Sequence, residues 1–382
     1  MAQQHLDPTD PQSDHVGPVT GDALAGYLRA QATEFLRALR LHRETGGTTA
    51  GANGAEDTVD AARALRRSVR RISGSLHTFR PLLDAEWSDA MRPELAWLSG
   101  TLAMEHAYRA RLERLLLALH RLSGAVFPAQ SAHAGAGSSS SGAVGSRSAG
   151  AAPDPRKAAP ENAGPPTDLP APDRGTLTVG AAKAGALLER QLTLARTRAH
   201  STALQALGSS RFHAVADSVA VLASEVPLTT TAAASALHPF AAAAEERLTD
   251  AIAVLPLVTA GSPYNAEALI HGLSPDPSPH PQDAPWHQVR LLLRLHRYAR
   301  EVLDGGRNAP IDVRLLTAGQ ALDRHRDASE AAAAAAQAAR TPRIAPATAY
   351  ALGVLHADQR HEVEAARFTF QQSWQKQAVG TP

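Results

Sequence analysis

The stretch from Asp60 to Asp84, DAARALRRSVRRISGSLHTFRPLLD, holds six arginines and no acid between positions 63 and 80. On a helix, where successive side chains lie about 100° apart, its apolar residues gather on one face and its arginines on the opposite face. Surface helices usually carry a Glu four residues from their bases, and the arginines of this segment have none. The alternative is a face that is merely solvated. We predict an anion-binding face made of Arg63, Arg66, Arg67, Arg70, Arg71 and His77.

A second segment, WHQVRLLLRLHRYAREVL at 286–303, carries a narrower stripe made of His287, Arg290, Arg294 and Arg297. Leucine and valine occupy most of the remaining circumference, which predicts a largely buried helix. A half-buried arginine is costly without a counter-charge, so we expect the stripe to face a groove and to meet an anion there. The adjacent Tyr298 is predicted to pack against neighbours and to use its hydroxyl as a hydrogen-bonding tip.

The two segments match each other at one constant offset along the chain, which places Arg66 and Arg70 at the positions of Arg290 and Arg294. An arginine-rich chain produces short matches of this kind by chance. Together with the order of the helices, however, the match indicates two related halves. Two such helices facing each other would form a basic channel.

Composition excludes several classes of protein. The 382 residues hold 38 Lys+Arg against 37 Asp+Glu, which excludes a protein whose entire surface is basic and binds nucleic acid. A local basic site is compatible with this balance. The chain has no Cys, which excludes disulfides, Fe–S clusters, thiol nucleophiles and thiolate zinc sites. Only three of the bases are lysines, a bias that GC-rich coding or selection for guanidinium groups explains equally well.

No segment predicts secretion or a membrane span. The first residues, MAQQHLDPTDPQSD, are polar and lack the basic-then-apolar layout of a signal peptide. The longest apolar runs, such as 251–260, are broken by Pro and fall short of the roughly 20 residues that a bilayer requires. We therefore expect a soluble, cytoplasmic protein with no membrane partner.

The fold class is predicted to be all-α, because alanine is abundant and aromatic and β-branched stretches are scarce. About ten helices are expected. They include one that starts at Asp57 or Thr58 and runs to Pro81, a pair at 86–100 and 102–122, and three at 286–303, 310–340 and 346–376, after an irregular stretch at 256–285. The predicted organisation is a disordered tail (1–19), a first half (20–127), a flexible Ala/Gly/Ser/Pro linker (128–176) and a second half (177–376).

The two arginine-bearing segments, 60–84 and 286–303, resemble a known family, the CHAD (conserved histidine α-helical) domain. Its signature helix, roughly His-x-x-Arg-x-x-x-(Lys/Arg)-Arg-x-Arg, occurs once in each half. His287, Arg290, Arg294, Arg297 and the following Tyr298 match the second copy, with Leu295 where a base is usual.

The first copy is matched less fully. Arg66, Arg70 and Arg71 agree with it, and LHTFRPLLD follows as in the family. Arg63 stands where the histidine belongs, which keeps a positive charge there, and Ser73 stands where the last arginine belongs. LDRHRDA at 322–328, which contains His325, and ARFTFQQSW at 366–374 resemble two further family segments. The resemblance covers about residues 20–376.

The resemblance implies a helical bundle of two pseudo-symmetric halves around a central basic pore that binds inorganic polyphosphate. Tyr298 and His325 are predicted to contact the polyphosphate together with the arginines and histidines of the two segments. The resemblance also implies an accessory protein located at polyphosphate granules. The residues support this independently, since two rows of guanidinium groups suit a linear chain of phosphates. The triphosphate tunnel domain, which is often fused to this family, has no matching motif here: Glu362 and Glu364 recur at its Glu-x-Glu spacing, but no Lys follows.

Two other functions stay open as alternatives. A helical nucleic-acid-binding protein would usually interleave aromatic stacking residues with the arginines, and this chain does not, so nucleic acid is not the expected partner. A phosphohydrolase that used the same basic cavity would need clustered acids for a metal, and His356 and His361 are spaced too far apart to form a metal pair on one helix face. We therefore predict no catalysis, no cofactor and no metal.

Overall fold

The computed structural model describes residues 19–46, 52–124, 174–262, 265–273, 280–305 and 312–375. These residues form ten α-helices and two isolated β-bridges but no strand, which confirms the all-α class. None of the helices in these ranges is both long and apolar enough to cross a membrane. The helices are α1 (Gly21–Gly46), α2 (Ala52–Thr78), α3 (Ala85–Ser123), α4 (Arg174–Leu207), α5 (Ser210–Ser224), α6 (His238–Ala253), α7 (Ala266–Gly272), α8 (Ala284–Leu303), α9 (Val313–Ala339) and α10 (Pro346–Gln375).

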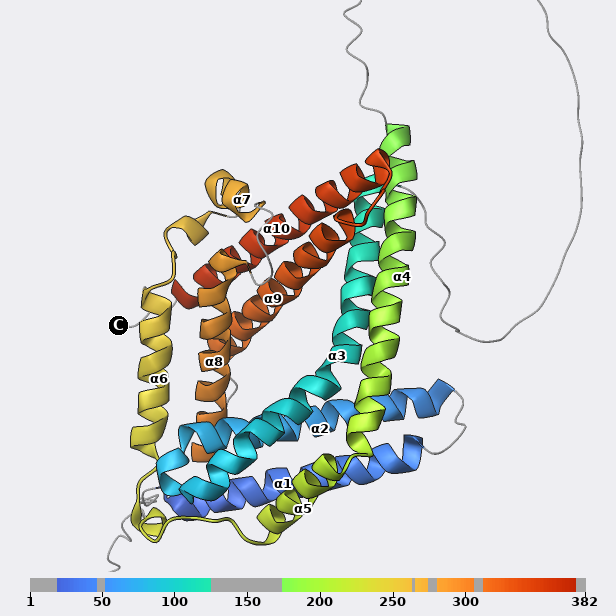
Figure 1. The fold of residues 1–382 in the computed structure, drawn as a ribbon. Coiled ribbons are helices and arrows are strands. Elements are labelled where there is room, and N and C mark those ends of the chain that lie inside the picture. The colour runs from blue at the N-terminus through green and yellow to red at the C-terminus, as the bar shows by residue number, and fades with distance from the viewer. Residues whose placement is uncertain are drawn as a thin grey trace, which may run out of the picture.

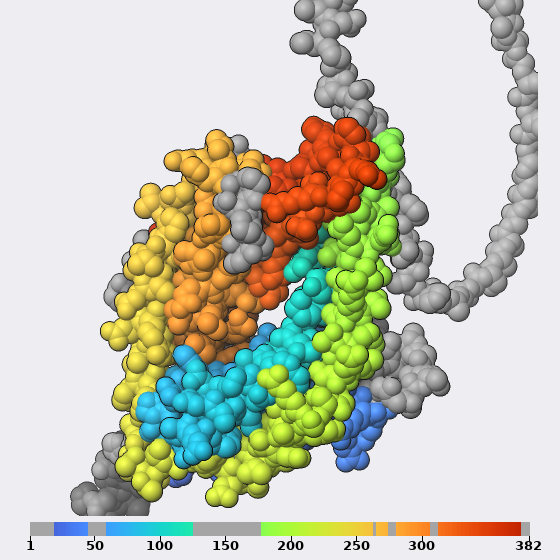
Figure 2. Space-filling view, in the orientation of Figure 1, coloured from blue at the N-terminus to red at the C-terminus, as the bar shows by residue number. Residues whose placement is uncertain are grey.

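The helices pack mainly in pairs, and the most extensive contacts join α9 to α10, α3 to α4, and α1 to α2. In Figure 1 these pairs form a frame, with α1 and α2 along the bottom, α3 and α4 on the right, α9 and α10 along the upper side, and α6 and α8 on the left. The space-filling view in Figure 2 is hollowed between α3 and the side formed by α8 and α9. The cationic helices α2 and α8 border this hollow.

Three hydrophobic cores hold the frame together. The first packs α1, α2, α5 and part of α3 around the predicted apolar face of α2, whose Leu65, Val69 and Ile72 are fully buried. The second joins α3, α4, α9 and α10, largely through alanines such as Ala331 and Ala335, whose small side chains let the helices approach closely. The third surrounds Trp286 where α6, α8, α9 and α10 meet.

The predicted boundaries differ from the structure in several places. A single helix, α3, replaces the expected pair at 86–100 and 102–122, because Gly100 between them costs only about 1 kcal/mol in a helix while Leu98 and Leu102 on either side are buried in the first core. The helix expected to start at Asp57 or Thr58 already begins at Ala52. It ends at Thr78, and one 3-10 turn follows it at Arg80–Leu82.

The predicted linker and tail fall mostly outside the described residues. Of the linker at 128–176, residues up to 173 are not described, and α4 begins at Arg174, inside its predicted end. Of the tail at 1–19, only Val19 is described. The stretch at 256–285, expected to be irregular, contains the short helix α7 between 3-10 turns at 259–261 and 281–283, and α8 begins inside its predicted end. Helices from both sides of the linker contribute residues to the first core, namely α1, α2 and α3 before it and α5, α6 and α8 after it.

Candidate functional site

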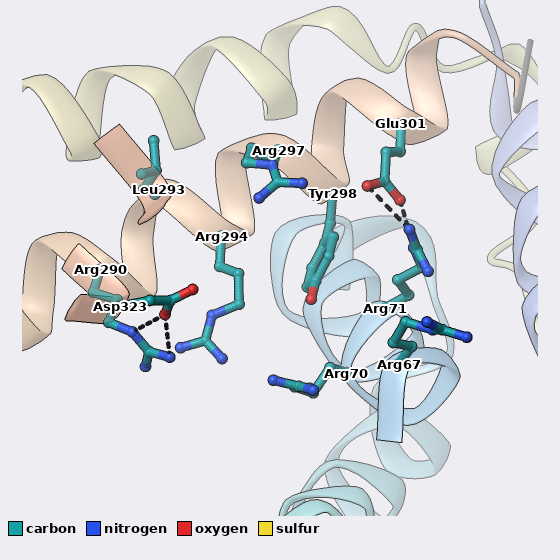
Figure 3. A pocket seen from close by; sticks show the side chains of 11 residues that line it. Arg67, Arg70, Arg71, Arg290, Leu293, Arg294, Arg297, Tyr298, Glu301 and Asp323 are labelled. Atoms are coloured by element: carbon teal, nitrogen blue, oxygen red, sulfur yellow. Dashed lines mark hydrogen bonds and ion pairs between the residues drawn. The ribbon is translucent and has the colours of Figure 1, made fainter. Parts of the chain in front are cut away.

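Seven of the predicted residues meet at one cavity between α2 and α8. Its volume is about 220 Å³, and α9 closes one side with Gly319 and Asp323. In the close-up of Figure 3, Arg70 of α2 and Arg294 of α8 point toward each other across this space, whereas Arg67 points away from α8. The predicted residues that line it are Arg67, Arg70, Arg71, Arg290, Arg294, Arg297 and Tyr298.

Two of these arginines have an acidic partner on another helix. Nε of Arg71 lies 2.7 Å from a carboxylate oxygen of Glu301 on α8. The guanidinium of Arg290 lies 2.6 Å from the carboxylate of Asp323 on α9. Both pairs are drawn in Figure 3. They fix the edges of the cavity and compensate part of its charge.

The remaining arginines of the cavity, Arg67, Arg70, Arg294 and Arg297, have no acidic ion-pair partner among the described residues. Burial, and secondly the charge of Arg290, lower the pKa of Arg294 to about 10. This guanidinium is still protonated at neutral pH, so it remains a half-buried cation that no acid of the described residues contacts. The cavity therefore holds more positive charge than the protein itself neutralises.

The cationic surface continues along α2 beyond the cavity. Burial, followed by the charges of Arg70 and Arg326, lowers the pKa of Arg66 to about 10. Nε of Arg66 is buried and has no hydrogen-bond partner among the described residues. Arg63, one turn earlier, is exposed and pairs with Asp60 on its own helix. The sequence analysis missed Arg326 of α9, because its place beside α2 depends on how the helices pack.

A glycine allows α2 and α8 to approach each other. A Cβ built on Gly74 would lie 2.5 Å from Cδ2 of Tyr298, so only glycine lets this tyrosine ring rest against α2. Tyr298 thereby separates the cavity from a larger neighbouring one. His77 lines that larger cavity rather than the smaller one. Partial burial, and then the charge of Arg92, lower the pKa of His77.

The structure places His325 apart from the cavities. Its side chain is 1% exposed, stacks on Trp286 at 5.6 Å between ring centroids, and accepts a hydrogen bond from Nε of Arg367 at 3.3 Å between nitrogens. Burial, and then the charge of Arg367, lower the pKa of His325 well below its usual value. The imidazole is therefore neutral, and it belongs to a buried polar network.

Asp283, immediately before α8, is the centre of that network. Its carboxylate accepts hydrogen bonds from Arg360 and Arg367 of α10, each at 2.7 Å, and from the hydroxyl of Ser329 on α9. Burial favours the neutral acid, but these bonds, those from Arg360 foremost, hold the pKa of Asp283 far below its usual value. The network anchors the start of α8, and thereby the arginine row, to α9 and α10. Sequence analysis missed it because Asp283 lies in a Pro-rich stretch without periodicity.

His287 lies between the network and the cationic surface. It is half-buried, and its ring meets that of His325 edge-on at 5.5 Å between centroids. Burial is the first cause that lowers its pKa, and the nearby charge of Arg290 adds to the effect. Within the described ranges, no group of three or more metal-ligating side chains is present.

Comparisons with known proteins agree with the resemblance seen in the sequence. The family model described as the CHAD domain matches residues 30–336. A solved structure of PptA from Streptomyces chartreusis is similar to this chain, with 66% sequence identity and a TM-score of 0.71. The match covers 94% of this chain and all of that one. A comparison with curated proteins finds no match.

Proposed function

The chain belongs to the CHAD domain family, and from this premise we propose that it binds inorganic polyphosphate at the arginine cavity between α2 and α8. The observation that carries the proposal is the imbalance of charge there. Guanidinium groups from two helices converge on a space of about 220 Å³, and four of them have no acidic partner among the described residues.

Polyphosphate supplies the negative charge that this cavity lacks. Each phosphate can accept two parallel hydrogen bonds from one guanidinium, and the arginines stand in a row along each helix. The chain of phosphates would run past Arg294 and Arg70 and continue along α2 toward Arg66 and Arg326 of α9. Because every neutralised phosphate releases counterions, binding should weaken steeply as salt is added.

We propose binding without catalysis, and a location at polyphosphate granules. The buried histidine of the network, His325, accepts a hydrogen bond from Arg367 and does not line the cavity, so it supports the structure rather than contacting phosphate. A series of aromatic platforms for bases does not line the cavity either, since Tyr298 is the one aromatic side chain among the described residues of its lining. These features favour polyphosphate over nucleic acid as the partner.

The test is a titration of the purified chain with long-chain polyphosphate and with single-stranded RNA of matched charge, at two salt concentrations. We expect polyphosphate to bind at least tenfold more tightly than RNA. The double variant Arg70→Gln/Arg294→Gln should lose at least tenfold in affinity for polyphosphate. The matched control is Arg196→Gln/Arg198→Gln, which removes the same charge from exposed positions on α4 and should change affinity less than twofold.

Two outcomes would contradict the proposal. One is equal affinity for polyphosphate and RNA that is lost together at moderate salt, which indicates a generic anionic attraction. The other is an equal loss of affinity in the cavity variant and in the α4 control, which indicates that total charge rather than the cavity determines binding.

A further inference from the structure

A second and larger cavity adjoins the arginine cavity. It has a volume of about 850 Å³ and opens between α2, α3 and α8. Arg70, Arg294 and Tyr298 line both cavities and form the wall that they share. A volume of this size is typical of sites that hold a small organic molecule.

The lining of the larger cavity is mainly apolar, unlike that of its neighbour. The apolar side chain of Leu291 is 46% exposed there, in a concave place rather than on a convex surface. Inorganic polyphosphate has no apolar part, so contact with this apolar lining contributes no favourable free energy to its binding. The lining positions that give this character are Pro93, Leu95 and Gly100 of α3 and Leu291, Leu292 and Leu295 of α8.

Unpaired arginine charge in this cavity comes from the wall that it shares with the arginine cavity, because Arg92, the other arginine of its lining, pairs with Asp89. Arg294 has no acidic partner among the described residues, and Nε of Arg70 is held by the carbonyl oxygen of Arg66 at 3.1 Å, which orients the rest of its guanidinium. The acid in the lining, Asp89, is already paired with Arg80 at 2.5 Å and with Arg92 at 3.3 Å. The cavity thus combines an apolar body with a cationic end.

We propose that this cavity binds a small organic phosphate, with its phosphate on Arg70 and Arg294 and its apolar body between α3 and α8. The ligand is a second one, different in class from polyphosphate. Because the two ligands share these arginines, each should displace the other. The apolar half of the site lies outside the arginine cavity, so its contribution can be removed separately.

The probe for this site is 1-naphthyl phosphate, and inorganic phosphate and 1-naphthol serve as its two halves. We expect 1-naphthyl phosphate to bind one site per chain, at least tenfold more tightly than either half, in a fluorescence titration of the full chain. Long-chain polyphosphate should displace it.

Two substitutions separate the apolar half from the charge. Nothing lies within 4 Å of a Cβ built on Gly100, so Gly100→Trp can extend into the cavity without a clash at its base. We expect it to weaken 1-naphthyl phosphate at least tenfold and polyphosphate less than twofold. The matched control is Gly353→Trp on α10, at another open glycine, which should change neither affinity. Leu291→Glu, at an exposed lining position, is the second variant and should act like Gly100→Trp.

The inference is overturned if 1-naphthyl phosphate binds no more tightly than inorganic phosphate, or if both cavity variants bind it as the unmodified chain does. A parallel loss of polyphosphate and 1-naphthyl phosphate in Gly100→Trp and Leu291→Glu would also overturn it, since the effect would then not be confined to the apolar cavity. A failure of polyphosphate binding alone would leave this result standing and would count against the proposed function only.

Discussion

At the scale of single residues, the arginines of the cavity differ in whether an acid faces them. Arg71 has Glu301, whose carboxylate also accepts a hydrogen bond from the hydroxyl of Tyr27 at 3.0 Å. Burial, and then Glu301, raise the pKa of Tyr27, so this hydroxyl keeps its proton. Arg294 has no such partner among the described residues. A buried cation without compensation is retained at a cost to stability, which is typical of a binding residue.

Replacing these two arginines by methionine should therefore change stability in opposite directions. Arg294→Met removes an uncompensated charge and keeps much of the volume, so we expect the free energy of unfolding to rise by about 1 kcal/mol. Arg71→Met leaves Glu301 half-buried without its cation and should lower the free energy of unfolding by about 2 kcal/mol. Urea unfolding of both variants measures this difference. A loss of stability in Arg294→Met equal to that in Arg71→Met would show that both arginines are structural.

At the scale of helices, the cavity depends on how closely α2 and α8 approach. Gly74 is buried, and its missing side chain leaves room for the ring of Tyr298. Gly100 of α3 is exposed and faces open space instead. A side chain at position 74 would therefore meet a neighbouring helix, whereas one at position 100 would not.

Alanine at these two positions should act in opposite directions. Gly74→Ala forces Tyr298 away from α2 and should lower the free energy of unfolding by about 1–3 kcal/mol. Gly100→Ala meets no neighbour and should raise it by about 0.5–1 kcal/mol, because alanine has less backbone freedom to lose in a helix. Adding Tyr298→Ala to Gly74→Ala should recover part of the loss. Stability unchanged by Gly74→Ala would show that the helices are not in close contact there.

For the molecule as a whole, the buried network around Asp283 joins three consecutive helices through residues that lie 46 to 84 positions apart in the chain. Asp283 precedes α8, while its partners lie on α9 and α10. His325 contributes to the same network through Arg367. Arg367 lies on α10, beyond residues 30–336 that the family model matches, and its bond to Asp283 ties α10 to the start of α8.

The network makes stability depend on pH. The folded state keeps His325 neutral because its pKa is well below 6.5, whereas the unfolded chain binds a proton at this residue below about pH 6.5. The unfolded state therefore binds more protons, and stability falls as the pH drops from 7.5 to 5.5. Asp283, whose pKa lies far below its usual value, adds a further loss only below about pH 4.

The variant His325→Gln tests this dependence, because it keeps an acceptor for Arg367 and removes the titrating group. We expect the loss of unfolding free energy between pH 7.5 and 5.5 to be smaller than in the unmodified chain by about 1.4 kcal/mol. Urea unfolding at both pH values measures it, and His213→Gln, at an exposed position on α5, is the control. An equal pH dependence in the variant and the unmodified chain would contradict the assignment of a neutral buried imidazole.

The amino-acid sequence is sufficient to predict the all-α class and the two faces of α2. Periodicity along one helix is a local property, so the buried Leu65, Val69 and Ile72 and the opposed arginines could be predicted. The same reasoning could not show that Gly100 lies within a single helix, because neighbouring contacts outweigh its small intrinsic cost.

Which arginines lack an acidic partner depends on how the helices pack together. The acids that compensate Arg71 and Arg290 come from other helices, and spacing rules within one helix do not reach them. For the same reason the burial of His325 beside Arg367, and the apolar cavity next to Arg294, could not be read from either segment alone. Charge compensation and burial depend on which helices pack together, and that is a property of the folded chain.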